Sequence, residues 1–287
     1  MALAKQEEYI LAQGDLYEGD LLNNVISKVH LTTSDSMRRL TFILLGLLTF
    51  SCQQREIKHP GICLSFDDRT IKEWYKMKDL LKKYNSHVTF FISQFDSLDS
   101  SEIKMLRQLE NEGHEIGSHG ALHVLSENYI KENSYDEYIK NEIDANSSAM
   151  KKHGFDPRSF AYPYGAKYWF TDMLLLKKFK ILRGVEAINS ERDLTLIDNI
   201  YYSFDGDRTL SAIGIDQGTG LTKEMIKNAI KRASDNQELL MLYGHSPITT
   251  TDNSPYNFNI DLLEFILNEA KENHLKYLKF SDLEPGD

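Results

Sequence analysis

Side chains able to carry out catalysis stand in a few short segments of this 287-residue chain. Asp67 and Asp68 are adjacent, His119 and His123 are four residues apart, and His245 follows a glycine. Two histidines at i and i+4 share one face of a helical turn and can grip one metal ion. A carboxylate with two imidazoles is a sensible ligand set for zinc, and it leaves the fourth coordination position for water.

Each segment also has a simpler interpretation. An Asp pair after a strand is often a turn or a helix cap, and a His pair at this spacing is often only solvated. The Tyr-Pro-Tyr-Gly run at 162–165 is a turn signal, and His245 could be a buried structural histidine. An Asp pair, a His pair and a single His at separate strand ends of one chain together favour a functional site.

The elements that must position these residues alternate along the chain. Strand-like apolar, β-branched or aromatic segments lie at 61–66, 87–92, 114–119, 159–162, 181–185, 238–243 and 275–280. Helical periodicity covers 70–84, 101–112, 135–153, 169–180, 222–235 and 260–273. This alternation predicts an α/β fold with a parallel sheet of βα units, and seven or eight strands favour a barrel. In such barrels the active site lies at the C-terminal ends of the strands, where the polar segments stand.

The composition excludes several classes of protein. With 41% hydrophobic and 26% charged residues, the chain is ordinary for a globular protein. Its formal net charge of −10 argues against nucleic acid as a partner, because such binding relies on Lys and Arg meeting phosphates. Two cysteines cannot build a disulfide framework or a Cys-rich zinc site. No apolar run reaches the roughly 18–20 residues that a membrane-spanning helix needs.

Residues 37–52 have the form of a secretory signal, with Met-Arg-Arg, an apolar run at 40–50, and Ser51 before Cys52. The cysteine after Ser51 makes the segment resemble a bacterial lipoprotein signal, in which this Cys becomes the lipidated first residue. We therefore expect lipidation of Cys52, with the protein anchored to a membrane of the bacterial cell envelope and facing the periplasm or the exterior. The alternative for the apolar run is a buried core helix.

The remaining chain divides at this signal. Residues 1–36 are expected to result from a start codon assigned too early, or to be added expression sequence. The alternative is a small helical extension. Residues 53–287 are expected to form one catalytic domain.

At the polar segments the chain resembles the polysaccharide deacetylases, the carbohydrate esterase family 4 or NodB-homology group. The family's T-F-D-D motif matches Ser-Phe-Asp-Asp at 65–68, and H-[ST]-x-x-H matches 119–123 with Gly120 in the hydroxyl position. The R-x-P-[YF] motif matches 161–164 without its Arg, and a Leu-x-His type strand end resembles 242–245. The resemblance covers about 61–283 and implies an irregular (β/α)7 barrel, a single domain after the N-terminal signal region.

The resemblance also implies roles for individual residues. It implies three ligands for a divalent metal, zinc with cobalt or nickel as alternatives: Asp68, His119 and His123. Asp67 would be the general base and His245 the general acid. The backbone N–H of Tyr164 would join the metal in holding the oxyanion. This division suits hydrolysis, which needs a polarised carbonyl, a deprotonated water and a protonated leaving group.

Two departures from the family pattern bear on these roles. Ala161 stands where the family has the Arg that pairs with the catalytic Asp, so another group must orient Asp67. The family's D-x-x-D-W motif, whose Asp tunes the catalytic His, has its nearest counterpart in the acidic turn at 202–208. Asp205 or Asp207 is therefore expected to be the acid that tunes His245, with a plain acidic turn as the alternative.

The implied function is that of a metal-dependent carbohydrate deacetylase. It would be a hydrolase of carbon–nitrogen bonds other than peptide bonds, with ester hydrolysis also possible, and its substrate an N- or O-acetylated polysaccharide or oligosaccharide. Two alternatives remain open: a sugar-binding protein with a decayed site, and a metal-dependent phosphoesterase, which would usually need ligands for a second metal. Release of acetate or of phosphate would separate the three.

Overall fold

The structure is a computed structural model that describes residues 59–287 apart from 167–168, 188–192, 251–253 and 284–287. These residues belong to one compact unit, Lys58–Asp287. The expected leader at 1–36, the expected signal at 37–52 and its Cys52 lie outside the described residues. Among the helices that are described, none has the length and apolar character to cross a membrane.

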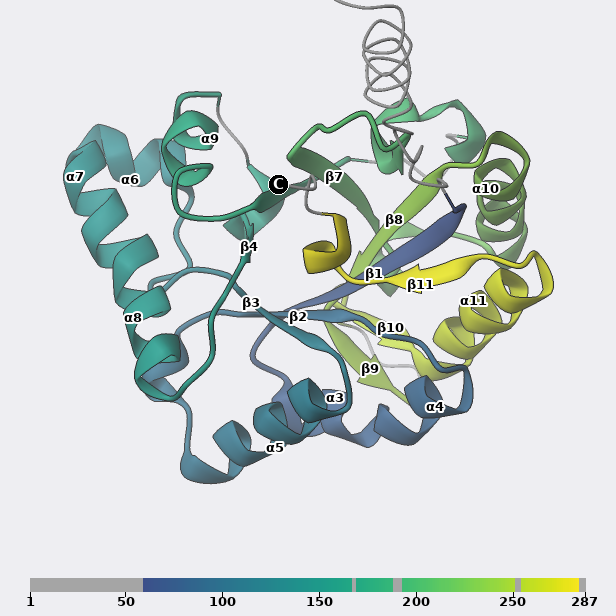
Figure 1. The fold of residues 1–287 in the computed structure, drawn as a ribbon, viewed down its shortest axis with the longest axis horizontal. Coiled ribbons are helices and arrows are strands. Elements are labelled where there is room, and N and C mark those ends of the chain that lie inside the picture. Colours follow the sequence, from purple (N-terminus) through teal and green to yellow (C-terminus); the bar gives the residue numbers. More distant parts are fainter. Residues whose placement is uncertain (1–58, 167–168, 188–192, 251–253, 284–287) are drawn as a thin grey trace, which may run out of the picture. The chain divides into compact units, whose positions relative to one another are not determined.

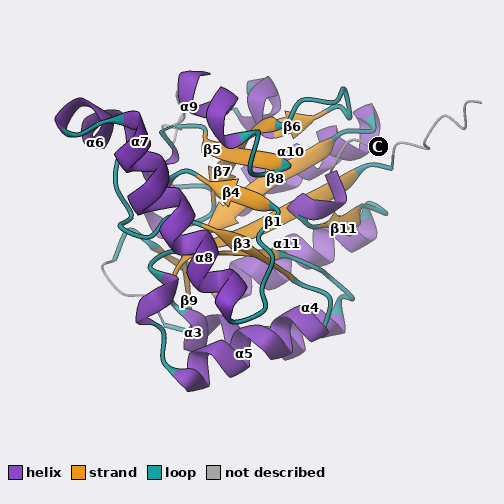
Figure 2. Ribbon diagram, turned by 60° about the vertical axis from the view of Figure 1, so that its left-hand side comes forward, coloured by secondary structure: helices purple, strands orange, loops and turns teal. Residues whose placement is uncertain are grey.

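A barrel of seven parallel strands forms the centre of this unit (Figures 1 and 2). Its strands are β1 (Gly61–Asp68), β2 (Thr89–Ile92), β3 (Glu115–Ser118), β4 (Ser159–Ala161), β5 (Ile181–Val185), β7 (Thr209–Gly214) and β8 (Leu239–Gly244). They are hydrogen bonded in this order, and β8 pairs with β1 to close the barrel. The predicted (β/α)7 barrel is therefore confirmed.

The barrel is irregular in two ways. Strands β11 (Lys276–Leu278) and β6 (Tyr201–Tyr202) also pair with barrel strands, so that β1 has three parallel neighbours and β8 gains an antiparallel one. In addition, β3 and β4 share only one backbone register pair, Ser118 with Phe160. Side chains join the two strands on either side of that pair. Ser159 Oγ donates to Glu115 Oε1 at 2.6 Å, and His119 Nδ1 lies 2.8 Å from the Ala161 carbonyl oxygen.

Helices surround the barrel (Figure 2). They are α3 (Ile71–Lys76), α4 (Lys78–Lys83), α5 (Ser100–Asn111), α6 (Ser126–Glu132), α7 (Tyr135–Tyr138), α8 (Ala145–Lys152), α9 (Trp169–Leu175), α10 (Lys223–Asn236) and α11 (Ile260–Glu272). Helices α10 and α11 pack together on one flank, and α6, α7 and α8 lie on the opposite flank (Figure 1). A two-stranded sheet of β9 (Ser246–Ile248) and β10 (Asn257–Asn259) follows β8.

The helical regions differ in detail from the sequence expectation. The predicted helix at 135–153 is divided by a π-helical segment, Ile139–Asp144, which separates α7 from α8. The predicted helix at 70–84 is two short helices that meet at Met77. Neither α6 nor strand β7 was expected from the sequence, because α6 is a short, polar helix and β7 carries small residues among its apolar ones.

The alternation of side chains along β1 determines which way the Asp67 side chain points at the end of the strand. Ile62, Leu64 and Phe66 belong to the large core between barrel and helices, whereas Cys63 belongs to a separate core with strand residues such as Phe91 and Ala161. Successive side chains of a strand point to opposite faces. Asp67 therefore follows Cys63 and Ser65 toward the barrel interior, at the carboxyl end of the strand.

Candidate active site

Asp67 and Asp68 both face one cavity although they are adjacent in a strand. A regular strand would point them apart. The backbone of Asp68 has φ +87°, in the left-handed region that only a few per cent of residues other than glycine adopt. This local turn at the end of β1 brings the second carboxylate to the same side as the first.

The carboxylate of Asp68 lies against both histidines of the i, i+4 pair. Its Oδ1 is 3.2 Å from His123 Nε2 and 3.6 Å from His119 Nε2. In the described part of the chain, these three are the only group of His, Cys, Asp or Glu side chains placed to hold a metal ion, with ligand atoms within 4.8 Å of one another. The triad expected from the sequence is therefore brought together at the barrel's carboxyl end.

Hydrogen bonding and charge prepare these side chains for a cation. The Ala161 carbonyl can only accept, so Nδ1–H of His119 donates to it and the lone pair of Nε2 faces the site. Burial lowers the pKa of His119, which favours the neutral form that binds metals. Burial alone would raise the pKa of Asp68, but the hydrogen bond from His123 and the charges of the nearby histidines bring it to about 2. The hydrogen bond to Asp68 raises the pKa of His123, so a metal ion would bind this imidazole in exchange for a proton. An anionic carboxylate and two imidazoles fit a zinc-like ion.

Arg183 on β5 holds the neighbouring carboxylate. Its Nη2 donates to Asp67 Oδ2, and both side chains are buried, at 0% and 3% exposure. The guanidinium lies over the rings of Phe91 and Tyr243, 5.4 and 4.8 Å from their centroids. Arg183 is the register partner of Ala161 on the neighbouring strand. Arg183, on the neighbouring strand, therefore supplies the positive charge that the family's Arg would supply at position 161.

The other oxygen of Asp67, Oδ1, is buried and has no hydrogen-bond partner among the described residues. A buried carboxylate oxygen without a donor can accept a proton from a small molecule that enters the cavity. Arg183 thus pairs with Oδ2 of Asp67 and leaves Oδ1 available to accept a proton.

His245 is held by Asp216, two residues beyond β7. Asp216 Oδ2 lies 2.6 Å from Nδ1 of the imidazole, and Asp216 Oδ1 accepts the backbone N–H of His245 at 3.0 Å. Burial lowers the pKa of His245, but the hydrogen bond and the charges of Asp216 and Asp67 outweigh it, so the net shift is upward. A raised pKa favours the protonated imidazole, the form that can donate a proton.

The acid beside His245 is thus Asp216, which corrects the expectation of Asp205 or Asp207. Those two residues lie in the turn between β6 and β7. Asp205 accepts from Ser203 Oγ, and Asp207 accepts the N–H and hydroxyl of Thr209. This is the ordinary behaviour of Asp in a turn, where the side chain satisfies nearby backbone donors.

The cavity that these groups face has a volume of about 400 Å³. Its lining residues are Asp67, Asp68, His119, His123, Tyr164, Gly165, Val185, Tyr243, His245 and Tyr256. Tyr164 follows β4 in a left-handed conformation, with φ +59°, and its ring is tilted against that of His123, with 4.9 Å between the ring centroids. Tyr164 and Tyr256 are each 66% exposed, so two aromatic rings stand at the mouth of the cavity.

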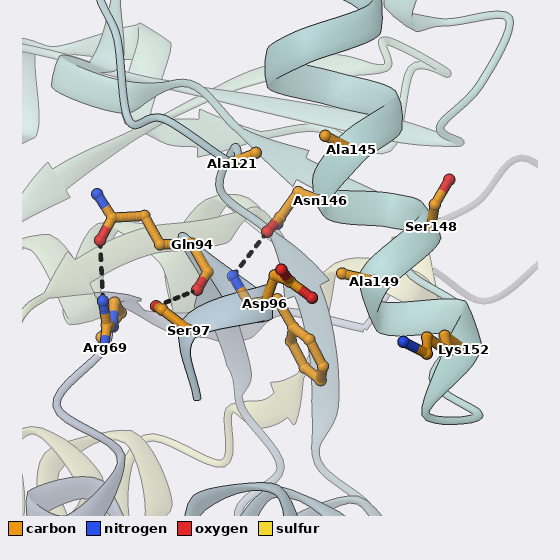
Figure 3. Close-up of a pocket in the computed structure, with 11 residues that line it drawn as sticks. Arg69, Gln94, Asp96, Ser97, Ala121, Ala145, Asn146, Ser148, Ala149 and Lys152 are labelled. Carbon is orange, nitrogen blue, oxygen red and sulfur yellow. Dashed lines mark hydrogen bonds between the residues drawn. The ribbon is translucent and has the colours of Figure 1, made fainter. Parts of the chain in front are cut away.

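A second cavity, of about 600 Å³, lies beyond the metal-ligand segments (Figure 3). Arg69, the residue after Asp68, donates to Gln94 on one side of it, and Asn146 of α8 accepts the N–H of Phe95. Ala121, which stands between the two histidine ligands in the chain, also lines it. The charged residues that line this cavity are Arg69, Lys152 and Asp96 (Figure 3). Because the carboxylate of Asp96 would repel an anion, the lining does not favour an anionic ligand.

Comparison with known proteins agrees with this geometry. Residues 54–178, which contain the Asp pair, the His pair and the Tyr-Pro-Tyr-Gly turn, match the sequence model of the family described as polysaccharide deacetylase. The chain thus carries, over 125 of its 287 residues, the sequence pattern of a polysaccharide deacetylase domain. It is accordingly a hydrolase of the class that removes acetyl groups from carbohydrates. No curated protein matches the sequence.

Solved structures resemble the polysaccharide deacetylase domain in fold. The Bc1960 peptidoglycan N-acetylglucosamine deacetylase is 18% identical with a TM-score of 0.54, covering 79% of this chain and 88% of its own. The Xyl-CE4 domain of a multidomain xylanase from the hindgut metagenome of Trinervitermes trinervoides is 19% identical with a TM-score of 0.50. That match covers 78% of this chain and 89% of the domain. At these identities the likeness concerns the fold.

Two residues that orient side chains of the site, Arg183 and Asp216, were not expected from the sequence. The signal for Arg183 was present, since it is a lone cation in the middle of an apolar strand, a position that charged residues occupy only when paired. Asp216 follows the strand that the sequence did not reveal. Ile213-Gly214-Ile215 marks the end of that strand, and a strand end there puts the carboxylate of Asp216 at the same face of the barrel as the other polar strand ends.

Proposed function

We propose that the protein is a metal-dependent deacetylase that hydrolyses N-acetyl or O-acetyl groups of a polysaccharide or oligosaccharide. The observation that carries this proposal is the set of side chains that face one cavity of about 400 Å³. It holds a metal-ligand triad, a buried carboxylate with one unpartnered oxygen, and an imidazole held by a second carboxylate.

The proposed mechanism assigns one task to each group. Asp68, His119 and His123 would hold a divalent metal, zinc in the first instance, which when bound polarises the acetyl carbonyl. Asp67 accepts a proton at Oδ1 from the water whose oxygen adds to the carbonyl carbon. His245 gives its proton to the departing nitrogen or oxygen as the acyl bond breaks, which releases acetate and the free amine or alcohol. The Tyr164 N–H is assigned to the oxyanion.

A polymeric substrate is supported by a neighbouring cavity. This cavity, of about 500 Å³, shares His123 and Tyr164 with the active-site cavity and continues along α6 past Asn128 and Tyr129. A single acetylated sugar would occupy only the first. Two adjoining cavities with an exposed tyrosine between them suit a chain of sugars, since aromatic faces bury the apolar side of a pyranose ring.

The proposed location rests on the sequence alone. Lipidation at Cys52 would tether the domain to the membrane of the cell envelope, where acetylated glycans are found outside the cytoplasm. Stable anchoring needs more than one acyl chain, and the lipoprotein-type signal at 37–52 fits such an anchor.

Acetate release tests the proposal directly. The purified protein is incubated with acetylated chitooligosaccharides and with acetylxylan, and acetate and phosphate are assayed beside the metal content. We expect acetate from at least one glycan, close to one metal per chain, and much less metal after His119→Ala or His123→Ala. Metal binding without acetate release would support the decayed sugar-binding protein. Phosphate release from phosphoesters would support the phosphoesterase, although the described residues offer ligands for only one metal.

A further inference from the structure

The loop that joins the two histidine ligands is held by a buried carboxylate from another element. Glu142 lies in the π-helical segment Ile139–Asp144 and is fully buried, at 0% exposure. Its Oε2 accepts the N–H of Leu122 at 2.5 Å, and its Oε1 accepts the N–H of Val124 at 3.1 Å. These two residues flank His123, so the carboxylate is hydrogen bonded to the backbone on both sides of a proposed metal ligand.

The backbone of Glu142 adds a third tie. Its carbonyl oxygen accepts the N–H of Ala121 at 2.9 Å. On the other side of the loop, the Gly120 carbonyl accepts the N–H of Gln94 at 2.8 Å. The segment needs such ties, because Gly120 and His123 both have left-handed backbones, with φ +85° and +57°. A non-glycine residue in this region is held there by its surroundings rather than by its own preference.

Gly120 leaves the space in which the Glu142 carboxylate lies. A Cβ added to Gly120 would stand 2.1 Å from Glu142 Oε1 and 2.6 Å from its Cδ. Any side chain at position 120 would therefore collide with the carboxylate, besides being strained at φ +85°. The glycine and the buried glutamate form one unit.

The π-helical segment explains how Glu142 reaches the loop. A π-bulge inserts one extra residue in a helix and re-aims the side chains around it, and such bulges are frequent at functional sites. The segment interrupts a helical run that is otherwise regular from Tyr135 to Lys152. It presents Glu142 and Ile143 to the interior, where both are buried.

We propose that Glu142 is a positioning residue that holds the loop of the two histidine ligands in its metal-binding geometry, through a contact that only glycine at position 120 permits. This inference rests on the proposed metal site. Glu142 does not line the active-site cavity and is not one of the three proposed ligands; it acts through the backbone on either side of His123.

The test compares Glu142→Gln with wild type. The amide keeps the size of the side chain but can accept only one of the two N–H groups, and its NH2 faces the other donor. We expect metal affinity, measured by competition with a chromophoric chelator, to fall about 10–100-fold, as is typical when a group behind a ligand is lost. kcat should fall in metal-limited buffer and recover in part with excess metal. Glu137→Gln, an exposed change on α7, is the matched control and should leave the affinity unchanged.

A purely structural role would give a different pattern. Glu142→Gln would then lower the melting temperature of the metal-free protein while folded molecules kept the wild-type metal affinity, and that result would overturn the proposal. If the wild type itself bound no metal, the proposed function would fail before the inference was tested, so the two failures are distinguishable.

The link to Gly120 has its own test in a double-mutant cycle. Gly120→Ala should weaken metal binding strongly in the wild type but less in a Glu142→Ala background, where the clash is absent and only the backbone strain remains. Additive effects would show that the two positions do not form one unit.

Discussion

Replacing Arg183 tests the most unusual feature of the site, the carboxylate of the proposed general base Asp67, whose cation comes from a different strand than in the family pattern. Arg183→Met keeps a long apolar stem but removes the guanidinium that pairs with Asp67. Asp67 is then left as a buried charge, with its side chain 3% exposed and its second oxygen already without a partner.

The size of the effect follows from that burial. Removing one partner of a buried ion pair costs about 3–5 kcal/mol, because the other charge stays desolvated. Solvent screening does not reduce this figure appreciably, since neither side chain is exposed. For a domain of this size, each kcal/mol lowers the melting temperature by about 2–4 °C. We therefore expect a fall of roughly 6–20 °C, or an Asp67 that takes up a proton to avoid its charge.

The change also affects the proposed general base, because Asp67 loses the group that orients it. Turnover measured as acetate release should fall by about 10²–10⁴-fold, the usual contribution of a positioned base. Arg183→Lys provides a graded control. It restores a positive charge but not the planar group between Phe91 and Tyr243, so its losses should be intermediate.

The double variant Ala161→Arg/Arg183→Met gives the sharpest comparison. Residues 161 and 183 are register partners on adjacent parallel strands, so their side chains point to the same face. An arginine at 161 recreates the family's arrangement and should recover part of both stability and turnover. Wild-type melting temperature and turnover in Arg183→Met would refute the assignment of Arg183.

Three further changes test other parts of the structure. Asp67→Asn should keep bound metal and fold but lose about 10²–10⁴-fold in acetate release, because an amide cannot accept the proton of water; metal analysis and turnover check this, and near wild-type turnover would contradict it. Asp216→Asn should lower the pKa of His245 and move the basic limb of the pH–rate profile to lower pH, whereas an unmoved limb would speak against the proton-donor role. In the wild type, the stability from this pair is present below pH about 6.5 and declines as pH rises through the raised pKa of His245, which pH-dependent melting can follow. Cys52→Ser should move the protein from the membrane fraction to the soluble fraction, and unchanged fractionation would remove the case for lipidation there.

The sequence alone predicted the barrel and the metal-ligand segments because these depend on local patterns. Asp67 and Asp68 end an apolar strand, and the i, i+4 spacing of the histidines is visible in the chain itself. Once the strands are taken to be parallel, their carboxyl ends must meet at one face of the barrel.

The residues that orient the catalytic groups depend on which strands are neighbours, and a single sequence does not contain that information. Arg183 reaches Asp67 only because β5 lies beside β4 in a register that puts it next to Ala161. Asp216 reaches His245 because β7 pairs with β8, through Ile213 with Leu242 and Gly214 with Tyr243. Thr209–Gly214 becomes a strand through these partners, since Ser, Ala and Gly give it little strand preference of its own.

The seam between β3 and β4 connects metal uptake to the closure of the barrel. With one backbone register pair, this seam is joined mainly by Ser159 with Glu115 and by the imidazole of His119 with the Ala161 carbonyl. The second of these is made by a metal ligand, and coordination at Nε2 fixes the tautomer that donates from Nδ1. An ion that binds the folded barrel more tightly than an opened one raises the free energy of opening by mass action. A bound metal would therefore stabilise the barrel seam that has the fewest backbone register pairs, and it would slow amide exchange of β4 as well as serve the reaction.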